Sequence, residues 1–304
     1  LEDYLAAHVE GFVRPLDVAQ FQGGMSNPTF MLTDGAGRRY VMRKKPPGKL
    51  LPSAHAVDRE YQVMTALRDT DVPVGRTYVL CEDDAVIGQA FFVMEHVEGR
   101  VLRDFALPGM TPAERYAHYA EMGDVLGRLH NVDFRAVGLE SYSRVGGYCA
   151  RQVKRWSAQY EASKTDDVPE MEKLIVWLND HMPESETTTI VHGDYRMENA
   201  IYHPERPEML AVIDWELGTL GDPFSDLAYN CLNYYMPDVD RGDITGIDLA
   251  DYGIPDEDEY VALYCKRRGI ERPAAWSFYL ALSMFRLGAI SQGVYKRGLE
   301  GNAS

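Results

Sequence analysis

The chain has 304 residues and carries 47 acidic against 31 basic side chains, which gives a formal net charge of −16 at pH 7. This acidic balance argues against a nucleic-acid binder and against docking on an anionic membrane, because both surfaces require clustered Lys and Arg. A hydrophobic content of 45% and a charged content of 26% are typical of globular proteins and exclude wholesale disorder.

Residues 1–98 alternate short β-branched and aromatic runs with Gly and Asp turns. The runs at 30–32 and 39–43 flank a glycine turn at 34–37, which predicts a β-hairpin. A helical spacing of apolar residues follows at 57–67, and further strands are expected at 76–80 and 90–94. The first third of the chain therefore predicts a small lobe built on an antiparallel sheet.

Past Gly99 the pattern turns mainly helical. Thr111, Pro112 and Glu114 form the N-cap, first helical position and third helical position of one well-marked helix start. We expect further helices at 147–162, 170–181, 223–235, 257–268 and 273–297. The predicted fold class is therefore α+β, with a small sheet-based lobe over 1–98 and a larger, mainly helical lobe over 99–304.

Four scattered cysteines form neither a C-x-x-C pair nor the spacing of a zinc site. They indicate reduced, buried thiols, so we expect a cytoplasmic protein. No apolar run reaches the roughly 18 residues that a membrane helix needs, and the first residues lack the pattern of a signal peptide. The sequence leaves the oligomeric state open.

The most informative stretch contains H-G-D at 192–194, Asn199 and I-D-W-E at 213–216. Residues 201–202 and 211–213 read as a short hairpin, which would return the chain so that Asn199 comes close to Asp214. A carboxylate and an amide beside a second carboxylate suit a hard cation, most naturally Mg²⁺. Asp194 could then accept a proton from an attacking hydroxyl, as phosphoryl transfer requires.

The spacing D-x-x-x-x-N matches the catalytic loop of protein kinases, but H-G-D and I-D-W-E replace their H-R-D and D-F-G. In these details the sequence resembles the aminoglycoside phosphotransferase family of small-molecule kinases, from about Phe21 to about Arg297. The resemblance implies a protein-kinase-like bilobal fold that uses ATP and Mg²⁺. It also implies that 1–98 is the nucleotide-binding lobe and 99–304 the catalytic and substrate-binding lobe.

By this resemblance, Asp194 is the catalytic base or hydroxyl-orienting residue, and Asn199 and Asp214 hold magnesium. Arg196 would stabilise charge on the migrating phosphoryl group, with a surface salt bridge as the alternative. Asp226 would anchor the catalytic loop through hydrogen bonds.

The nucleotide site would begin with a short phosphate loop, in which small residues let backbone N–H groups approach a phosphate. Its members by resemblance are Gly23, Gly24, Ser26 and Asn27.

Val41 and Arg43 share one face of the next strand because side chains alternate along a strand. Arg43 stands where kinases place a Lys, and Glu60 on the following helix is its expected partner. Val41 would cover the adenine, whose edge would meet backbone groups near Glu95 and Val97.

Within the family, the sequence is most similar to the branch whose kinase domain is fused ahead of some acyl-CoA dehydrogenases. That likeness implies a small-molecule acceptor, with the hydroxyl of a hydroxyacyl compound as the preferred substrate. An aminoglycoside acceptor and a nucleotide-binding pseudokinase are the alternatives. Residues 237–259 hold nine acids and one Arg, which indicates a solvated segment or, alternatively, a cation-binding rim.

Overall fold

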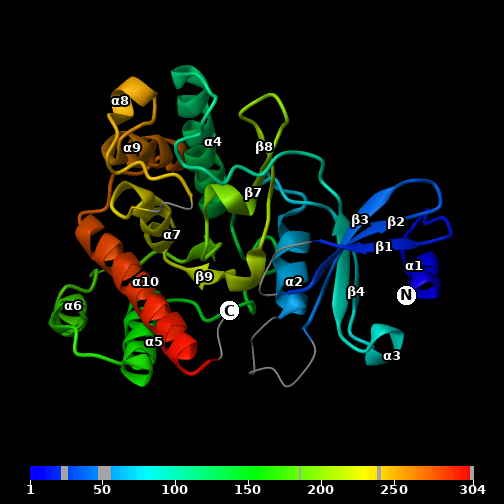
Figure 1. Ribbon diagram of the computed structural model, residues 1–304, viewed down its shortest axis with the longest axis horizontal. Coiled ribbons are helices and arrows are strands. Elements are labelled where there is room, and N and C mark those ends of the chain that lie inside the picture. The colour runs from blue at the N-terminus through cyan, green and yellow to red at the C-terminus, as the bar shows by residue number, and fades with distance from the viewer. Residues whose placement is uncertain (22–26, 47–55, 185, 238–240, 302–304) are drawn as a thin grey trace. The chain divides into compact units, whose positions relative to one another are not determined.

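The structure, a computed structural model, describes residues 1–21, 27–46, 56–184, 186–237 and 241–301. By their contacts the residues divide into two compact units. Figure 1 labels helices and strands of both on a ribbon coloured from the N-terminus to the C-terminus. The first unit comprises Leu1–Leu102, Ala136–Leu139 and Glu198–Gly218, and the second comprises Arg103–Arg135, Glu140–Met197 and Thr219–Ser304. The lobe boundary near residue 98 stays a prediction, and the first unit contains a segment from much later in the chain.

A five-stranded antiparallel sheet forms the centre of the first unit, in the order β1-β2-β3-β5-β4. The predicted hairpin is confirmed as β2 paired with β3, and the turn is closed by a 2.8 Å hydrogen bond from Gly37 N to Asp34 O. The strands are β1 (Asp17–Gln20), β2 (Thr29–Thr33), β3 (Arg39–Lys44), β4 (Thr77–Cys81) and β5 (Phe91–Glu95).

The two faces of this sheet pack against different helices. Helix α1 (Glu2–His8) inserts Leu5 against one face, where Tyr40 and Met42 of β3 join the core. Because side chains alternate along a strand, Val41 and Arg43 point to the other face, where α2 (Val57–Leu67) packs. The short helix α3 (Asp84–Ile87) follows β4.

A second hairpin belongs to the same unit although it lies a hundred residues further along the chain. Its strands are β7 (Ala200–Tyr202) and β8 (Met209–Val212), as the sequence predicts. Arg100 and Tyr202 exchange two backbone hydrogen bonds of 2.8 Å, and Val212 N donates to Pro73 O at 2.8 Å. These bonds join the hairpin to the segments that flank β4 and β5.

The second unit is mainly helical. Helix α4 begins with the predicted capping box of Thr111 and Glu114. Helix α7 stops at Asn230, five residues earlier than predicted, and the chain continues as a 3₁₀ turn over Cys231–Tyr234. The helices are α4 (Pro112–Asn131), α5 (Tyr148–Ser163), α6 (Pro169–Asp180), α7 (Pro223–Asn230), α8 (Leu249–Tyr252), α9 (Glu257–Arg268) and α10 (Trp276–Leu299).

Two short strands in this unit, β6 (Thr189–Val191) and β9 (Thr219–Gly221), pair antiparallel and were not predicted. In the sequence, β6 comes before Asp194 and β9 comes after the second hairpin. All four cysteines lie in the described part of the chain and are buried free thiols, as expected. Among the described residues, no helix combines the length and the apolar character that a membrane crossing demands.

Candidate active site

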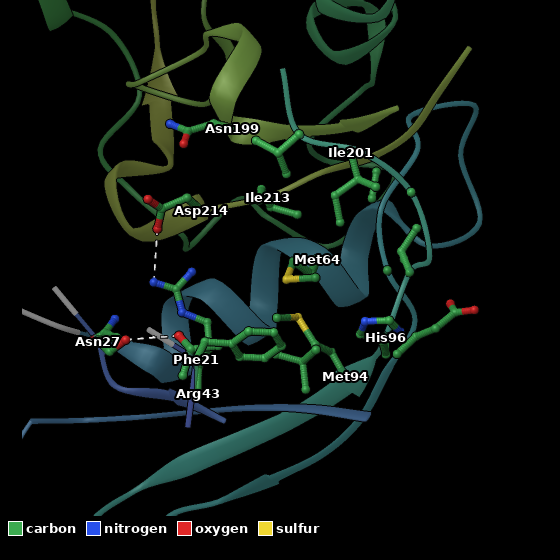
Figure 2. A pocket seen from close by; sticks show the side chains of 18 residues that line it. Phe21, Asn27, Arg43, Met64, Met94, His96, Asn199, Ile201, Ile213 and Asp214 are labelled. Carbon is green, nitrogen blue, oxygen red and sulfur yellow. Dashed lines mark hydrogen bonds and ion pairs between the residues drawn. The ribbon is translucent and has the colours of Figure 1, made fainter. Parts of the chain in front are cut away.

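Strand β3 directs Val41 and Arg43 into a cavity of about 450 Å³ in the first unit. Arg43 extends from the strand toward α2 and toward the loop after β8 (Figure 2). Its Nη1 lies 2.6 Å from Glu60 Oε1 and its Nη2 lies 3.0 Å from Asp214 Oδ1. The sequence predicted the Glu60 pair, whereas the contact with Asp214 is an addition from the structure.

The Arg43–Glu60 pair is removed from water, because the two side chains are 10% and 1% exposed. Burial raises the pKa of Glu60 to about 7, although the guanidinium of Arg43 opposes this shift. Burial alone would lower the pKa of Arg43, but the carboxylates of Glu60 and Asp214 raise it above its ordinary value. Arg43 is therefore a fixed cation between two carboxylates.

The β7–β8 hairpin brings Asn199 and Asp214 to the same end of the cavity. Ile213 N donates to Asn199 O at 2.9 Å, which places the two predicted metal ligands beside each other as expected. Asp214 has a φ of 67°, a left-handed conformation that costs free energy in residues other than Gly. This conformation turns the chain sharply after β8.

The donor set at this end fits magnesium held together with a nucleotide. Asn199 supplies an amide oxygen and Asp214 a carboxylate whose side chain is 35% exposed, so ligands from solvent can complete the coordination. Mg²⁺ commonly keeps several waters and binds through one or two protein side chains plus phosphates. No group of three or more His, Cys, Asp or Glu suited to a metal occurs among the described residues, so a cage made only of these side chains is not seen there.

The rest of the cavity is largely apolar. Figure 2 shows Phe21, Met64, Met94, Ile201 and Ile213 around it, with Ile213 beside Asp214. None of these five residues was predicted from the sequence to line the site. For Ile201 and Ile213 a signal was available, since the predicted hairpin alternation places Ile213 on the same face as Ala211, the partner of Ile201.

The chain that leaves β5 forms another wall, to which Glu95, His96 and Val97 contribute. Gly99 follows, and a Cβ atom there would lie 2.4 Å from Tyr202 O and 2.5 Å from Ile201 Cγ2. Only glycine lets the backbone approach the hairpin this closely. The segment with Glu95 and Val97, whose backbone is predicted to contact the adenine, is therefore held against the β7–β8 hairpin, which forms another wall of the cavity.

The predicted phosphate loop is only partly described. Gly23, Gly24 and Ser26 lie outside the described residues. Asn27 is buried and lines the cavity near Arg43, and its carbonyl accepts a 3.0 Å hydrogen bond from Thr29 Oγ1 (Figure 2).

Asp194 and Arg196 lie in the second unit, on the loop after β6. Arg196 Nη2 contacts Asp194 Oδ2 at 3.1 Å, and both side chains are partly exposed. The carboxylate of Asp226 accepts hydrogen bonds from His192 N at 2.5 Å and Gly193 N at 2.8 Å. This confirms the predicted anchoring of the loop by Asp226.

A smaller cavity of about 140 Å³ lies in the same unit beside Arg196 and Tyr229. Burial raises the pKa of Tyr229, and Asp194 adds to the shift through its charge and a hydrogen bond. The described residues around the cavity provide two guanidinium groups, two amides and several apolar surfaces: Phe105, Arg196, Tyr229, Asn230, Leu232, Asn233, Met236, Pro237, Arg241 and Leu287.

The structure thus brings together Asn27, Val41, Arg43, Glu95, Val97, Asn199 and Asp214 around one cavity, with Glu60 bonded to Arg43. Asp194 and Arg196 form their own pair in the other unit. The chemical roles assigned to all of these residues stay predictions.

Comparison with known proteins identifies the family to which this chain is similar. The model of the APH phosphotransferase enzyme family matches residues 17–265. The mouse protein "Acyl-CoA dehydrogenase family member 10" is 48% identical over 307 residues, which cover 100% of this chain and 28% of that protein. The chain thus spans less than a third of the length of this relative.

Solved structures agree with the family model. A crystal structure from Ralstonia eutropha, provisionally assigned as an aminoglycoside phosphotransferase, has a TM-score of 0.92 at 50% identity and covers 99% of this chain and 89% of its own. Amicoumacin kinase, solved with AMP-PNP and Ca²⁺, has a TM-score of 0.61 at 18% identity and covers 96% of this chain and 84% of its own. The second likeness supports the kinase-like α+β fold alone.

Proposed function

Because the chain belongs to the APH phosphotransferase enzyme family, we propose that it transfers the γ-phosphoryl group of ATP to a hydroxyl of a small molecule with the help of Mg²⁺. One observation carries the proposal. A single cavity joins an apolar slot to a polar end that holds Arg43, Asn199 and Asp214, which is the chemistry that a base and a metal-bound triphosphate require.

In this proposal the apolar slot receives the adenine, with Val41 on one side and the backbone at Glu95 and Val97 along its edge. Arg43 binds the phosphates, and Glu60 fixes its orientation. The phosphate loop contributes through Gly23, Gly24, Ser26 and Asn27.

Asn199 and Asp214 would hold the metal ion. When bound, Mg²⁺ neutralises charge that develops on the phosphates. Asp194 would accept a hydrogen bond from the acceptor hydroxyl and take its proton as the new P–O bond forms, while the bond from the γ-phosphorus to the β–γ bridging oxygen breaks and ADP leaves. Arg196, paired with Asp194, would stabilise negative charge on the migrating group.

The test is ATP turnover by purified protein with and without Mg²⁺. We expect Asp194→Asn and Asp214→Ala each to reduce turnover by about 10²-fold or more, since each removes a group that acts in the transition state. Glu205→Gln, on the exposed turn of the same hairpin, is the matched control and should behave as wild type. Full turnover in either aspartate variant would refute the mechanism. A wild-type protein that binds ATP without any turnover would instead support the pseudokinase alternative.

For the acceptor, we propose the hydroxyl of a hydroxyacyl compound. The cavity of about 140 Å³ supports this choice, because its described lining combines apolar side chains with the guanidinium groups of Arg196 and Arg241. An aminoglycoside is a polycation and would favour carboxylates there. The name of the mouse relative points toward acyl chemistry as well.

Labelled ATP incubated with a panel of hydroxyacyl-CoAs, free hydroxy acids and aminoglycosides distinguishes these acceptors. Selective transfer to a hydroxyacyl compound is expected, and Arg241→Ala should raise its KM more than it lowers kcat. Selective transfer to an aminoglycoside would overturn the acceptor assignment and leave the kinase assignment intact.

A further inference from the structure

The loop that carries Asp194 is bonded to helix α7, and α7 is bonded to helix α9 directly or through His130 of α4. The catalytic roles above do not use these connections. Helix α7 presents Asp226 and Asn230 to this loop. Helix α9 presents Tyr260 to Asn230 and Tyr264 to His130 of α4. Residues four apart lie on one face of a helix, so each helix offers a pair of polar side chains on a single face. Both helices belong to the second unit (Figure 1).

The first connection reaches the loop just before Asp194. The hydroxyl of Tyr264 lies 2.7 Å from Nδ1 of His130, and Nε2 of His130 lies 3.4 Å from Asp226 Oδ2. Asp226 in turn accepts from the amides of His192 and Gly193. Tyr264, His130 and Asp226 are each at most 3% exposed, so water does not substitute for these bonds.

The hydrogen bonds along this connection all donate in the same direction, from Tyr264 through His130 to Asp226. Arg268 Nη1 donates to the Tyr264 hydroxyl oxygen at 2.9 Å, which leaves the O–H of Tyr264 to donate to His130. Since Asp226 can only accept, Nε2 of His130 carries the proton that it donates. Burial lowers the pKa of His130, in agreement with a neutral imidazole.

The second connection reaches the loop just after Asp194. Tyr260 donates to Asn230 Oδ1 at 2.5 Å, and Asn230 Nδ2 donates to Tyr195 O at 3.0 Å. Tyr260 is 1% exposed. The backbone is therefore held at residues 192 and 193 on one side of Asp194 and at residue 195 on the other.

We propose that Tyr260 and Tyr264 of α9 are positioning residues, which hold the backbone on both sides of Asp194 through Asn230 and through His130 with Asp226. The proposal rests on the role of Asp194 given above. Neither tyrosine touches the substrate in this proposal. Each acts through other side chains on the direction in which the Asp194 carboxylate points.

Tyr260→Phe, Tyr264→Phe and the double variant test the proposal, because each change removes a hydroxyl and keeps the buried ring. Tyr234→Phe is the matched control, since its hydroxyl makes a 2.8 Å bond to Pro255 O and does not lead to the loop. The kinetic readout is Mg·ATP hydrolysis by water, which needs no identified acceptor. The structural readout is amide hydrogen exchange in peptides that cover residues 190–197.

We expect kcat to fall roughly tenfold in each single variant and further in the double variant, because small displacements of a catalytic group are costly. The KM for ATP should stay within about twofold of wild type, since the substrate cavity is unchanged. Exchange should accelerate at 190–197 in the tyrosine variants and not in Tyr234→Phe. The single variants keep the test valid if the double variant does not fold.

Wild-type kcat and wild-type loop exchange in both single variants would overturn the proposal. The proposal would also be overturned if the tyrosine variants accelerated exchange uniformly along the chain and to the same extent as Tyr234→Phe. That result would mean a loss of global stability alone. Hydrogen exchange is measured without catalysis, so the positioning of the loop can be judged even where Asp194→Asn shows that the proposed function is wrong.

Discussion

At the scale of single residues, the central feature is Arg43 between Glu60 and Asp214. The bonds of 2.6 Å and 3.0 Å use both terminal nitrogens of one guanidinium, which a lysine ammonium could not reproduce with the same geometry. Arg43 thereby links α2 to the loop after β8 within the first unit. Its removal should affect stability as well as nucleotide binding.

Arg43→Ala should lower the free energy of unfolding by about 3–5 kcal/mol at pH 8, because it leaves Glu60 buried without its counter-charge. Adding Glu60→Gln should restore part of that loss by removing the buried charge. Urea unfolding of the two variants and wild type measures both effects. If the double variant is no more stable than Arg43→Ala, the uncompensated charge is not the cause.

The raised pKa of Glu60 should also make the free energy of unfolding depend on pH. Its folded-state pKa of about 7 lies above the value of 4.5 expected for an exposed Glu, so between these values the folded state keeps a proton that the unfolded state has lost. The free energy of unfolding of wild type relative to Glu60→Gln should therefore decrease as the pH rises from about 4.5 to about 7. Each pH unit across that window contributes at most about 1.4 kcal/mol. Parallel stability curves for the two proteins would contradict the raised pKa.

At the scale of secondary-structure elements, the β7–β8 hairpin is the part that completes the cavity of about 450 Å³. It contributes Asn199, Ile201, Ala211, Ile213 and Asp214. Its attachment to the chain after β5 depends on the close approach at Gly99 and on the paired backbone bonds between Arg100 and Tyr202. The width of the slot is set where these two segments meet.

Gly99→Ala should therefore separate the two segments, since its Cβ would collide with the backbone oxygen of Tyr202 as well as with Cγ2 of Ile201. We expect the Kd for ATP to rise about tenfold, equivalent to about 1.4 kcal/mol, together with a lower Tm. Gly298→Ala on α10 is the control, because a Cβ there meets no atom within 4 Å. Calorimetric titration with ATP compares them, and an unchanged Kd in Gly99→Ala would show that the close approach does not shape the slot.

At the scale of the whole molecule, the first unit is assembled from distant parts of the chain. Binding of Mg·ATP should slow amide hydrogen exchange in β3, in residues 95–101 and in residues 199–214, because all three line one cavity. Exchange in α5, α6 and α10 serves as the internal reference. Protection limited to the first 102 residues would mean that the hairpin does not take part in binding.

The sequence predicted those parts of the fold and site that follow from local patterns. Strand alternation placed Val41 and Arg43 on one face, and hairpin geometry placed Asn199 beside Asp214. Local patterns could not predict that Met64 lines the slot or that Tyr264 is bonded to His130. His130 and Tyr264 are 134 positions apart, and no local spacing specifies which helix faces which.

The divided make-up of the first unit has a consequence for synthesis on the ribosome. Chains fold as they emerge from the N-terminus, yet the hairpin that supplies Asn199 and Asp214 follows α4, α5 and α6 in the chain. When residue 102 has left the ribosome, all five strands of the sheet have been translated, but one wall of the cavity has not. The cavity proposed for the nucleotide is therefore incomplete until the segment that ends at residue 214 has been translated.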